Sequence, residues 1–352
     1  MNGFLMIEKP MGGTKIGCFH EQPGQPTNTF KFNHSDAPQG VTSLEANRRL
    51  LHISTYASVV VASSLVVLKF LAWMLSYSVE MLSSLIDSGL DTLASVVTLV
   101  AVSHALAPAD REHRFGHGKA EAIAALGQAA FIAGSALFLI FESGNRLMRP
   151  QSIEYGHLAI SVMVVSILLT LGLVCFQNYV IARTQSMAIG ADSAHYKADL
   201  FVNCGIIASL ILTTQLNIPL ADPLIALAVA LYILHTARKV GITALDALMD
   251  HELSEDDRAR ITRIVQTHAK VRGLHDLRTR MAGMQPFIQL HLELPGDITL
   301  DDAHLISDQV EEQLLKEFPD AEVIIHQDPE GLNEVTDDFS AALNDSFHPF
   351  LN

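Results

Sequence analysis

Six long apolar stretches alternate with short polar connections over the first 245 residues of the chain. The hydrocarbon core of a bilayer is about 30 Å thick and needs about 20 apolar residues per helix. Windows of that length predict spans at residues 53–75, 79–106, 119–142, 156–180, 200–217 and 221–245. The fifth window is short, and the preceding MAIGADSAHYKADL completes it as a span whose first turns are polar. The pattern therefore predicts a six-helix transmembrane domain over residues 48–250.

The hydropathy pattern changes near residue 250 to that of a small soluble domain. EDDRARITRIVQTHAKV has helical spacing behind an acidic first turn, and TLDDAHLISDQVEEQLLKEF opens like a second helix. LHDLRTRM, PFIQLHLEL and AEVIIHQD alternate like strands. The expected fold class is an α-helical membrane protein with a cytoplasmic C-terminal α+β domain of order αββαβ over residues 251–332. Residues 1–47 are expected to form a flexible extension, and residues 333–352 a loose tail.

The composition supports the membrane assignment and separates the two parts by charge. The 352 residues are 49% hydrophobic and only 17% charged, with a mean hydropathy of +0.28. Residues 250–352 carry 22 acidic and 8 basic side chains, so a net charge of −14 of the total −15 lies there. A domain this acidic is not expected to bind nucleic acid. The three cysteines are widely spaced and predict no disulfide framework.

Lysine and arginine are distributed unequally between the two sides of the predicted membrane domain. One side has only Arg146 and Arg149, whereas the other has Arg48, Arg49, Arg111, Arg114, Lys119, Arg183, Arg238 and Lys239. The positive-inside rule therefore places both termini in the cytoplasm and predicts a multi-pass protein of the bilayer. The first 40 residues lack a basic segment followed by a continuous apolar core, so no secretory signal is expected.

Two predicted spans carry ionisable residues at matching intervals. Asp87 and Asp91 are four residues apart in the second span, and His195 and Asp199 are four apart in the fifth. Residues at positions i and i+4 share one helix face about 6 Å apart along the axis. Ionisable groups inside a span cost at least about 2.5–3.5 kcal/mol each and normally face a polar cavity. Two such helices facing each other predict a four-coordinate metal site.

One imidazole and three carboxylates suit Zn²⁺ and related divalent ions such as Cd²⁺ or Fe²⁺, while the absence of thiolates argues against Cu(I). An empty site with three ionised carboxylates would be strongly anionic, so it is expected to hold either a divalent cation or protons. Exchange of protons for metal is therefore the working hypothesis, with His195 as a group that titrates near neutrality. Asp192, one turn before His195, is interpreted as a solvated acid or one on the access path.

A second group of candidate ligands lies in the cytoplasmic loop PADREHRFGHGKAE. Asp110, His113 and His117 are spaced by three and four residues, which is compatible with one metal ion at a turn near the membrane face. Exposed histidines near acids are common without any metal, so spacing alone leaves both interpretations open.

A third group lies in the soluble domain. His326 and Asp328 are two residues apart on a predicted strand, so they share a face. With the other histidines of this domain, they could form a two-metal site bridged by the carboxylate, consisting of His275, His291, His304, His326 and Asp328.

Together, the DxxxD of the second span, the HxxxD of the fifth, FGHGKAE, LHDLRTR and VIIHQDP resemble the cation diffusion facilitator (CDF) family, in particular its bacterial YiiP/FieF zinc/iron efflux branch. The similarity extends from about residue 48 to about residue 330. It implies a homodimeric antiporter in the bacterial inner membrane that exports Zn²⁺ from the cytoplasm in exchange for protons by alternating access, with a metallochaperone-like cytoplasmic domain.

The resemblance also implies roles for the candidate residues. The three groups would be the transport site, a loop site and a binuclear zinc site that bridges the soluble domains of the dimer. An interlocking ion pair would join Lys119 to Asp250.

Two other functions are weighed against transport. A metalloenzyme normally keeps an open coordination position, and the HExxH motif of zinc proteases is absent, so no enzyme activity is expected. A metal sensor that transports nothing would need only the soluble sites, so the ligands inside the membrane favour a transporter.

Overall fold

The computed structural model describes residues 39–77, 79–148, 157–215, 218 and 220–331. Six of its helices are long and apolar enough to cross a membrane: α1 (Gln39–Ser76), α2 (Val79–Ala105), α3 (Ala120–Met148), α4 (His157–Thr184), α5 (Met187–Gln215) and α6 (Ala221–Leu248). The six predicted spans are therefore confirmed. α5 includes the polar turns before residue 200, as the sequence predicts.

The first helix is longer than its predicted span. α1 begins at Gln39, inside the segment 1–47 that the sequence predicts as an extension. Good helix formers such as Leu44, Glu45 and Ala46 continue the helix beyond the apolar window. Residues 1–38 and the predicted tail at 333–352 lie outside the described residues.

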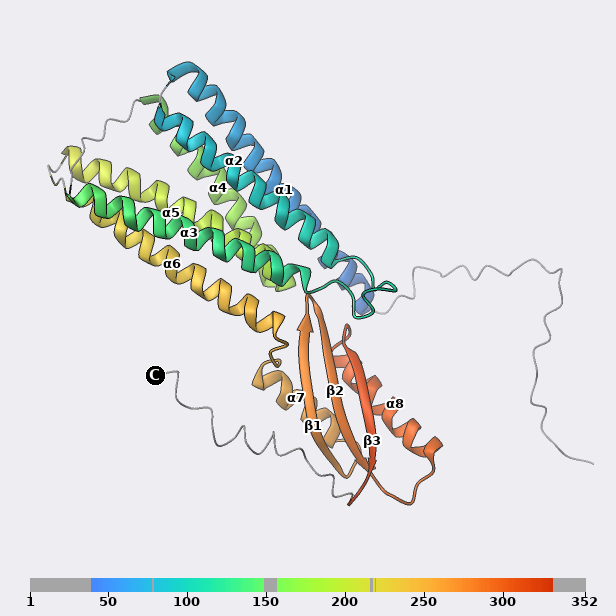
Figure 1. Cartoon of the computed structure of the whole chain (residues 1–352). Coiled ribbons are helices and arrows are strands. Elements are labelled where there is room, and N and C mark those ends of the chain that lie inside the picture. Colours follow the sequence, from blue (N-terminus) through green and yellow to red (C-terminus); the bar gives the residue numbers. More distant parts are fainter. Residues whose placement is uncertain (1–38, 78, 149–156, 216–217, 219, 332–352) are drawn as a thin grey trace, which may run out of the picture.

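The six helices form two groups. Figure 1 shows α1, α2 and α4 together and α3, α5 and α6 together, with the groups close near the soluble domain and divergent at the far end. Small residues allow close approach within the second group, since Ala125, Ala191 and Ala244 from its three helices form one buried cluster. Large apolar side chains such as Leu75 and Phe138 are exposed on the outside, as expected for a surface that faces lipid.

The soluble domain has the predicted order αββαβ. It consists of α7 (Glu255–Gln266), β1 (Gly273–Ala282), β2 (Gln285–Leu294), α8 (Leu300–Glu317) and β3 (Glu322–Pro329). Ser254 and Thr299 cap the two helices by accepting hydrogen bonds from the N–H groups of Asp257 and Asp302.

The three strands form one sheet in the order β1-β2-β3. β1 and β2 are antiparallel, whereas β2 and β3 are parallel. Alternate residues of β2, such as Leu290 and Leu292, pack with Ile306, Val310 and Leu314 of α8 into a buried core. Both helices therefore cover one face of the sheet and leave the other face uncovered.

The β1-β2 turn contacts the loop between α2 and α3. Gly118 lies so close to the turn that a Cβ added to it would lie 2.2 Å from the carbonyl oxygen of Ala282. Gly283 follows in the left-handed region at φ +63°, with the Gly118 Cα directly beside it. Two glycines thus permit a backbone-to-backbone contact between the membrane and soluble domains.

Charged and aromatic side chains surround this contact. Lys119 Nζ lies 2.9 Å from Asp250 Oδ1, the pair that the family resemblance implies, and Arg280 lies 3.1 Å from the same oxygen. Partial burial raises the pKa of Asp250, but hydrogen bonds from Lys119 and Arg280 outweigh it and hold that pKa below its usual value. Phe115 of the loop packs edge-on against Phe287 of β2.

Candidate metal centres

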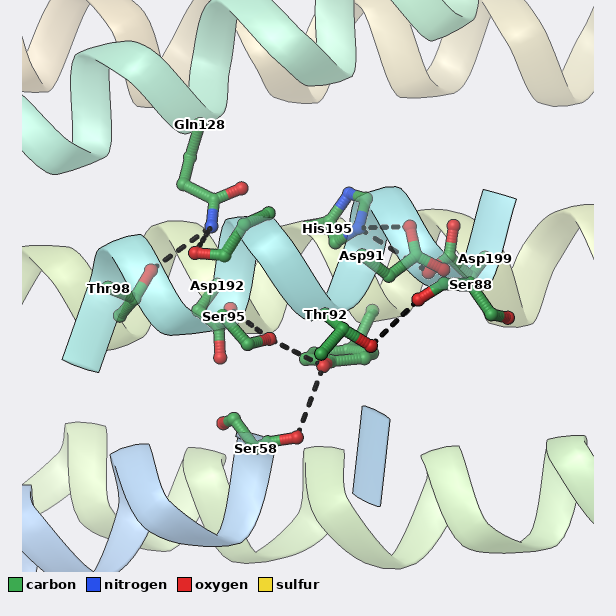
Figure 2. Close-up of polar contacts among 12 residues, drawn as sticks. Ser58, Ser88, Asp91, Thr92, Ser95, Thr98, Gln128, Asp192, His195 and Asp199 are labelled. Atoms are coloured by element: carbon green, nitrogen blue, oxygen red, sulfur yellow. Dashed lines mark hydrogen bonds and ion pairs between the residues drawn. The ribbon is translucent and has the colours of Figure 1, made fainter. Parts of the chain in front are cut away.

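The first candidate centre lies between α2 and α5, within the membrane domain. His195 Nε2 is 2.9 Å from Asp91 Oδ1 and 3.7 Å from Asp199 Oδ2. Figure 2 shows the three side chains pointing toward one another. One ligand atom from each of the three residues lies within 4.8 Å of the others, so one ion can contact all three. The ring of His195 is 95% buried and packs edge-on against Phe131, which limits its orientation. The structure therefore brings together ligands from both of the matched pairs that the sequence predicts.

Asp87 differs from the other three residues. Its side chain is exposed, and it does not belong to the compact group of ligand atoms. It lies one turn from Asp91 on α2, on the side farther from the soluble domain. The divergence of α2 from α5 in that direction separates it from the site (Figure 1).

A buried polar network lies next to His195 on the side nearer the soluble domain. Asp192 accepts hydrogen bonds from Gln177 Nε2 at 2.8 Å and from Ser95 Oγ at 3.4 Å. Ser95 also bonds to Tyr196, whose hydroxyl donates to the Ser58 carbonyl (Figure 2). All five side chains are at least 98% buried. The network joins α1, α2, α4 and α5, and the interpretation of Asp192 as a solvated acid is wrong because neighbouring helices enclose it.

Sequence reasoning missed Lys69 of α1. Its Nζ donates to Ser88 Oγ at 2.6 Å and to the Ser84 carbonyl at 3.2 Å. The ammonium thus lies against α2, where it interacts electrostatically with Asp87, Asp91 and Asp199. The available signal was that Lys69 is the one charged residue in the apolar window 53–75.

The second candidate centre is in the loop between α2 and α3. Asp110 Oδ2 lies 3.3 Å from His117 Nε2, and Asp110 Oδ1 lies 3.5 Å from His113 Nδ1. Hydrogen bonds from the backbone N–H groups of His113 and Glu112 lower the pKa of Asp110. The carboxylate is thus ionised and oriented toward both imidazoles. The three predicted residues do come together, with ligand atoms within 4.8 Å.

The third candidate centre lies on the uncovered face of the sheet. His275 pairs with His291, which pairs with His326, so the three imidazoles form a row across β1, β2 and β3. Asp328 is 94% buried beside them. Its Oδ2 lies 2.9 Å from His291 and 3.5 Å from His275, and its Oδ1 lies 3.1 Å from His326. A carboxylate with histidines on both oxygens has the arrangement expected of a bridging ligand.

Within one chain, His304 does not join this row. It lies on α8, 70% exposed, beside Asp308 at 3.5 Å. α8 covers the sheet face opposite to the histidines, so its side chains cannot reach them. Gln327 also points away from the row, because successive residues of β3 face opposite sides of the sheet. It donates a hydrogen bond to Ser307 of α8 at 2.8 Å.

Sequence comparison decides the family. The pattern of the cation efflux transmembrane domain matches residues 55–249, and that of the cation efflux protein cytoplasmic domain matches residues 253–330. The chain belongs to the cation efflux family. The resemblance to the CDF family and its FieF-like branch is thereby confirmed.

Relatives in this cation efflux family match over nearly their whole length. The cation-efflux pump FieF of Shewanella oneidensis is 48% identical over 277 residues, covering 79% of this chain and 93% of that protein. The cation-efflux pump FieF of Klebsiella pneumoniae is 43% identical over 281 residues, covering 80% and 93%. The metal-bound C-terminal domain of the CzcD transporter from Thermotoga maritima matches with 28% identity and a TM-score of 0.22, covering 23% of this chain and all of that one.

All three candidate centres of this cation efflux protein lie within the matched segments. The ligands between α2 and α5 and those of the loop lie in the transmembrane segment, and the histidine row lies in the cytoplasmic segment.

Proposed function

We propose that this protein exports a divalent metal cation, Zn²⁺ in the first place, from the cytoplasm in exchange for protons. The observation that carries the proposal is the cluster of Asp91, His195 and Asp199 between two membrane helices. Side chains of this kind are costly within a bilayer and are typical of ion pathways. Membership of the cation efflux family supports the same conclusion.

The ligand types favour zinc or cadmium. A histidine nitrogen together with carboxylate oxygens suits Zn²⁺, whereas a site made of oxygen alone suits Mg²⁺, Ca²⁺ or Mn²⁺. Asp87 becomes the fourth ligand when α2 moves toward α5, since it lies one turn from Asp91 on the same helix face.

Charge supports the exchange of protons for metal. Without a cation, the carboxylates of Asp91 and Asp199 repel each other in a region of low dielectric constant. A dication or protons must offset this charge, so metal release is coupled to proton uptake. The ammonium of Lys69 offsets part of the charge but cannot leave, because it is covalently attached to α1.

The burial around the site supports alternating access. The polar network centred on Asp192 closes the path toward the soluble domain, whereas the exposed fraction rises from 5% at His195 to 34% at Asp199. In this proposal, the described arrangement is the one closed on the cytoplasmic side and open on the other. A second arrangement, in which the helix groups separate near Asp192, would admit metal from the cytoplasm.

The cytoplasmic centre is proposed to hold zinc and to join two copies of the chain. Its histidine row lies on a sheet face that nothing in the described chain covers. A second copy facing this surface completes the coordination, and His304 contributes there rather than within its own chain. Metal at this centre then biases the membrane domain through the glycine contact at Gly118. Asp328→Asn tests this regulation, and an unchanged dependence of transport on metal concentration would refute it.

The deciding experiment measures flux in vesicles of lipid that contain the purified protein. Zn²⁺, Cd²⁺, Fe²⁺ and Mn²⁺ are supplied in turn, with and without an imposed pH gradient, to the wild type and Asp91→Ala. Thr92→Val is the matched control, because among the residues that the structure describes its hydroxyl bonds only to the Ser88 carbonyl of its own helix, at 2.8 Å.

The expected result is zinc flux that follows the pH gradient, is lost in Asp91→Ala and is kept in Thr92→Val. Flux that ignores the gradient would refute proton exchange. Metal binding without flux in the wild type would refute transport and favour a sensor.

A further inference from the structure

The end of α2 places a fourth imidazole next to the loop centre. His104 lies in the last turn of α2, and its ring centroid is 4.5 Å from that of His117 in an edge-on arrangement. The ring of His113 is also close to that of His117, at 4.7 Å between centroids. His117 therefore lies next to both other imidazoles, and Asp110 lies beside His113 and His117.

His117 carries a nitrogen that is buried without a hydrogen-bond partner. Its side chain is 94% buried, and among the described residues no group bonds to Nδ1. A buried imidazole nitrogen left in this way costs about 1–3 kcal/mol unless something binds it. His117 and the residues after His104 also line a cavity of about 320 Å³ between the loop, α1 and the β1-β2 turn. The cavity therefore has room for an ion beside His117.

The distances between the imidazole rings fit coordination of one tetrahedral ion. Two imidazole nitrogens bound at about 2.0–2.1 Å to one tetrahedral ion lie about 3.3 Å apart, which places the ring centroids about 5 Å apart. The observed separations of 4.5 Å and 4.7 Å are close to this value. His104 is exposed, so rotation about its side-chain bonds is open to it. The ligand atoms that lie within 4.8 Å of one another come from Asp110, His113 and His117, so such a rotation is what directs a nitrogen of His104 toward the ion.

We propose that His104 is the fourth ligand of the loop centre and closes a tetrahedral site of three histidines and Asp110 for Zn²⁺ or a similar divalent ion. The proposal rests on the proposed function, because it requires the loop to bind metal. Four protein ligands with no open position are typical of a structural rather than a catalytic zinc site.

The position of His104 gives such a site a mechanical role. His104 is on the same helix as Asp87 and Asp91, whereas His113 and His117 belong to the loop that contacts the soluble domain through Gly118. An ion bound by all of them ties the cytoplasmic end of the transport helix to that contact. Metal in the loop then restrains how α2 moves during the transport cycle.

The test uses the full-length protein in detergent with the other two centres disabled by His195→Gln and Asp328→Asn. Co²⁺ serves as the probe, because a tetrahedral Co²⁺ ion absorbs visible light much more strongly than a five- or six-coordinate one. Into this background we introduce His104→Phe, which keeps a ring against His117 but has no nitrogen. Asp110→Asn marks complete loss of the site, and thermal unfolding of each variant reports whether it folds.

We expect Co²⁺ to bind the background protein with the intense tetrahedral spectrum. His104→Phe should weaken that spectrum and reduce the Co²⁺ and Zn²⁺ affinity at least about tenfold, since even groups that only support a ligand are worth 10–100-fold. If His104→Phe leaves spectrum and affinity unchanged while Asp110→Asn abolishes both, His104 is a packing residue and the proposal is overturned, although the loop still binds metal. If the background binds no Co²⁺, the loop centre itself is refuted, whereas zinc flux through the Asp91 site remains a separate measurement.

Discussion

Substitution of Gly118 by alanine should release the contact between the membrane and soluble domains. The added methyl group would lie 2.2 Å from the carbonyl oxygen of Ala282, 2.4 Å from its carbonyl carbon and 2.8 Å from the nitrogen of Gly283. All three are backbone atoms, so no side chain can rotate away. Restoring ordinary van der Waals contact requires the β1-β2 turn to move by about 1 Å.

The contacts around the β1-β2 turn give an estimate of the free energy that holds the two domains together. The turn is held near the loop by Asp250, which forms exposed ion pairs with Lys119 and with Arg280 of β1, each worth about 0–1 kcal/mol. The edge-on contact of Phe115 with Phe287 adds about 0.5–1.5 kcal/mol. Overpacking of this kind usually costs about 1–3 kcal/mol. The strain therefore costs about as much as the contacts contribute, so Gly118→Ala should largely remove the preference for the attached domains. The equilibrium between attached and separated domains should shift by roughly 5- to 150-fold.

Amide hydrogen exchange of the full-length protein in detergent measures this shift. Gly118→Ala should raise the exchange rates of residues 113–121 and 279–288, and leave those of the α7 and α8 core unchanged. Gly127→Ala is the matched control, because it adds the same methyl group to an exposed site in α3 where, apart from the neighbouring backbone of its own helix, no atom of the described residues lies within 4 Å. If both segments exchange at the same rates in Gly118→Ala, Gly127→Ala and the wild type, the close approach does not hold the domains together and the reasoning is refuted.

Three further predictions concern single side chains. Lys69→Met removes a cation near Asp91 and Asp199 and should tighten Zn²⁺ binding there on the order of fivefold, about 1 kcal/mol, whereas Lys69→Arg should not. Calorimetry on Asp328→Asn protein measures this affinity, and weaker binding in Lys69→Met contradicts the prediction. Gln177→Leu deprives the buried Asp192 of its 2.8 Å donor and should cost about 1–3 kcal/mol in thermal or denaturant unfolding, so an unchanged transition argues against the network. Asp250→Asn removes the charge but keeps a residue type that tolerates the backbone angle of φ +58° at this position. The pKa of Asp250 is lowered in the folded protein, so its ionised carboxylate contributes to stability above about pH 4, and this contribution is lost as the pH falls below that value. The variant should therefore be slightly less stable than the wild type at pH 7, with a difference that fades below about pH 4, and a difference that grows on acidification would contradict the assignment.

The sequence by itself determined which segments form helices and strands, and which residues share a face. Apolar windows located the six spans, alternation located the three strands, and the i, i+4 spacing paired His195 with Asp199. These features depend on helical and strand periodicity, which is local, so no knowledge of neighbouring elements was needed. The loop ligands Asp110, His113 and His117 were found for the same reason, because one short segment carries all three.

Only the tertiary structure decided which faces meet. The divergence of the two helix groups leaves Asp87 outside the compact site although it shares a helix with Asp91, and the position of α8 behind the sheet separates His304 from the histidine row. Conversely, packing brings Lys69 to α2 and His104 to the loop, although neither residue belongs to a motif that the sequence singles out. The physical reason is that periodicity fixes the direction of a side chain around its own axis, whereas the tilt and spacing of packed elements depend on contacts between residues far apart in the chain, such as the backbone contact of Gly118 with Ala282.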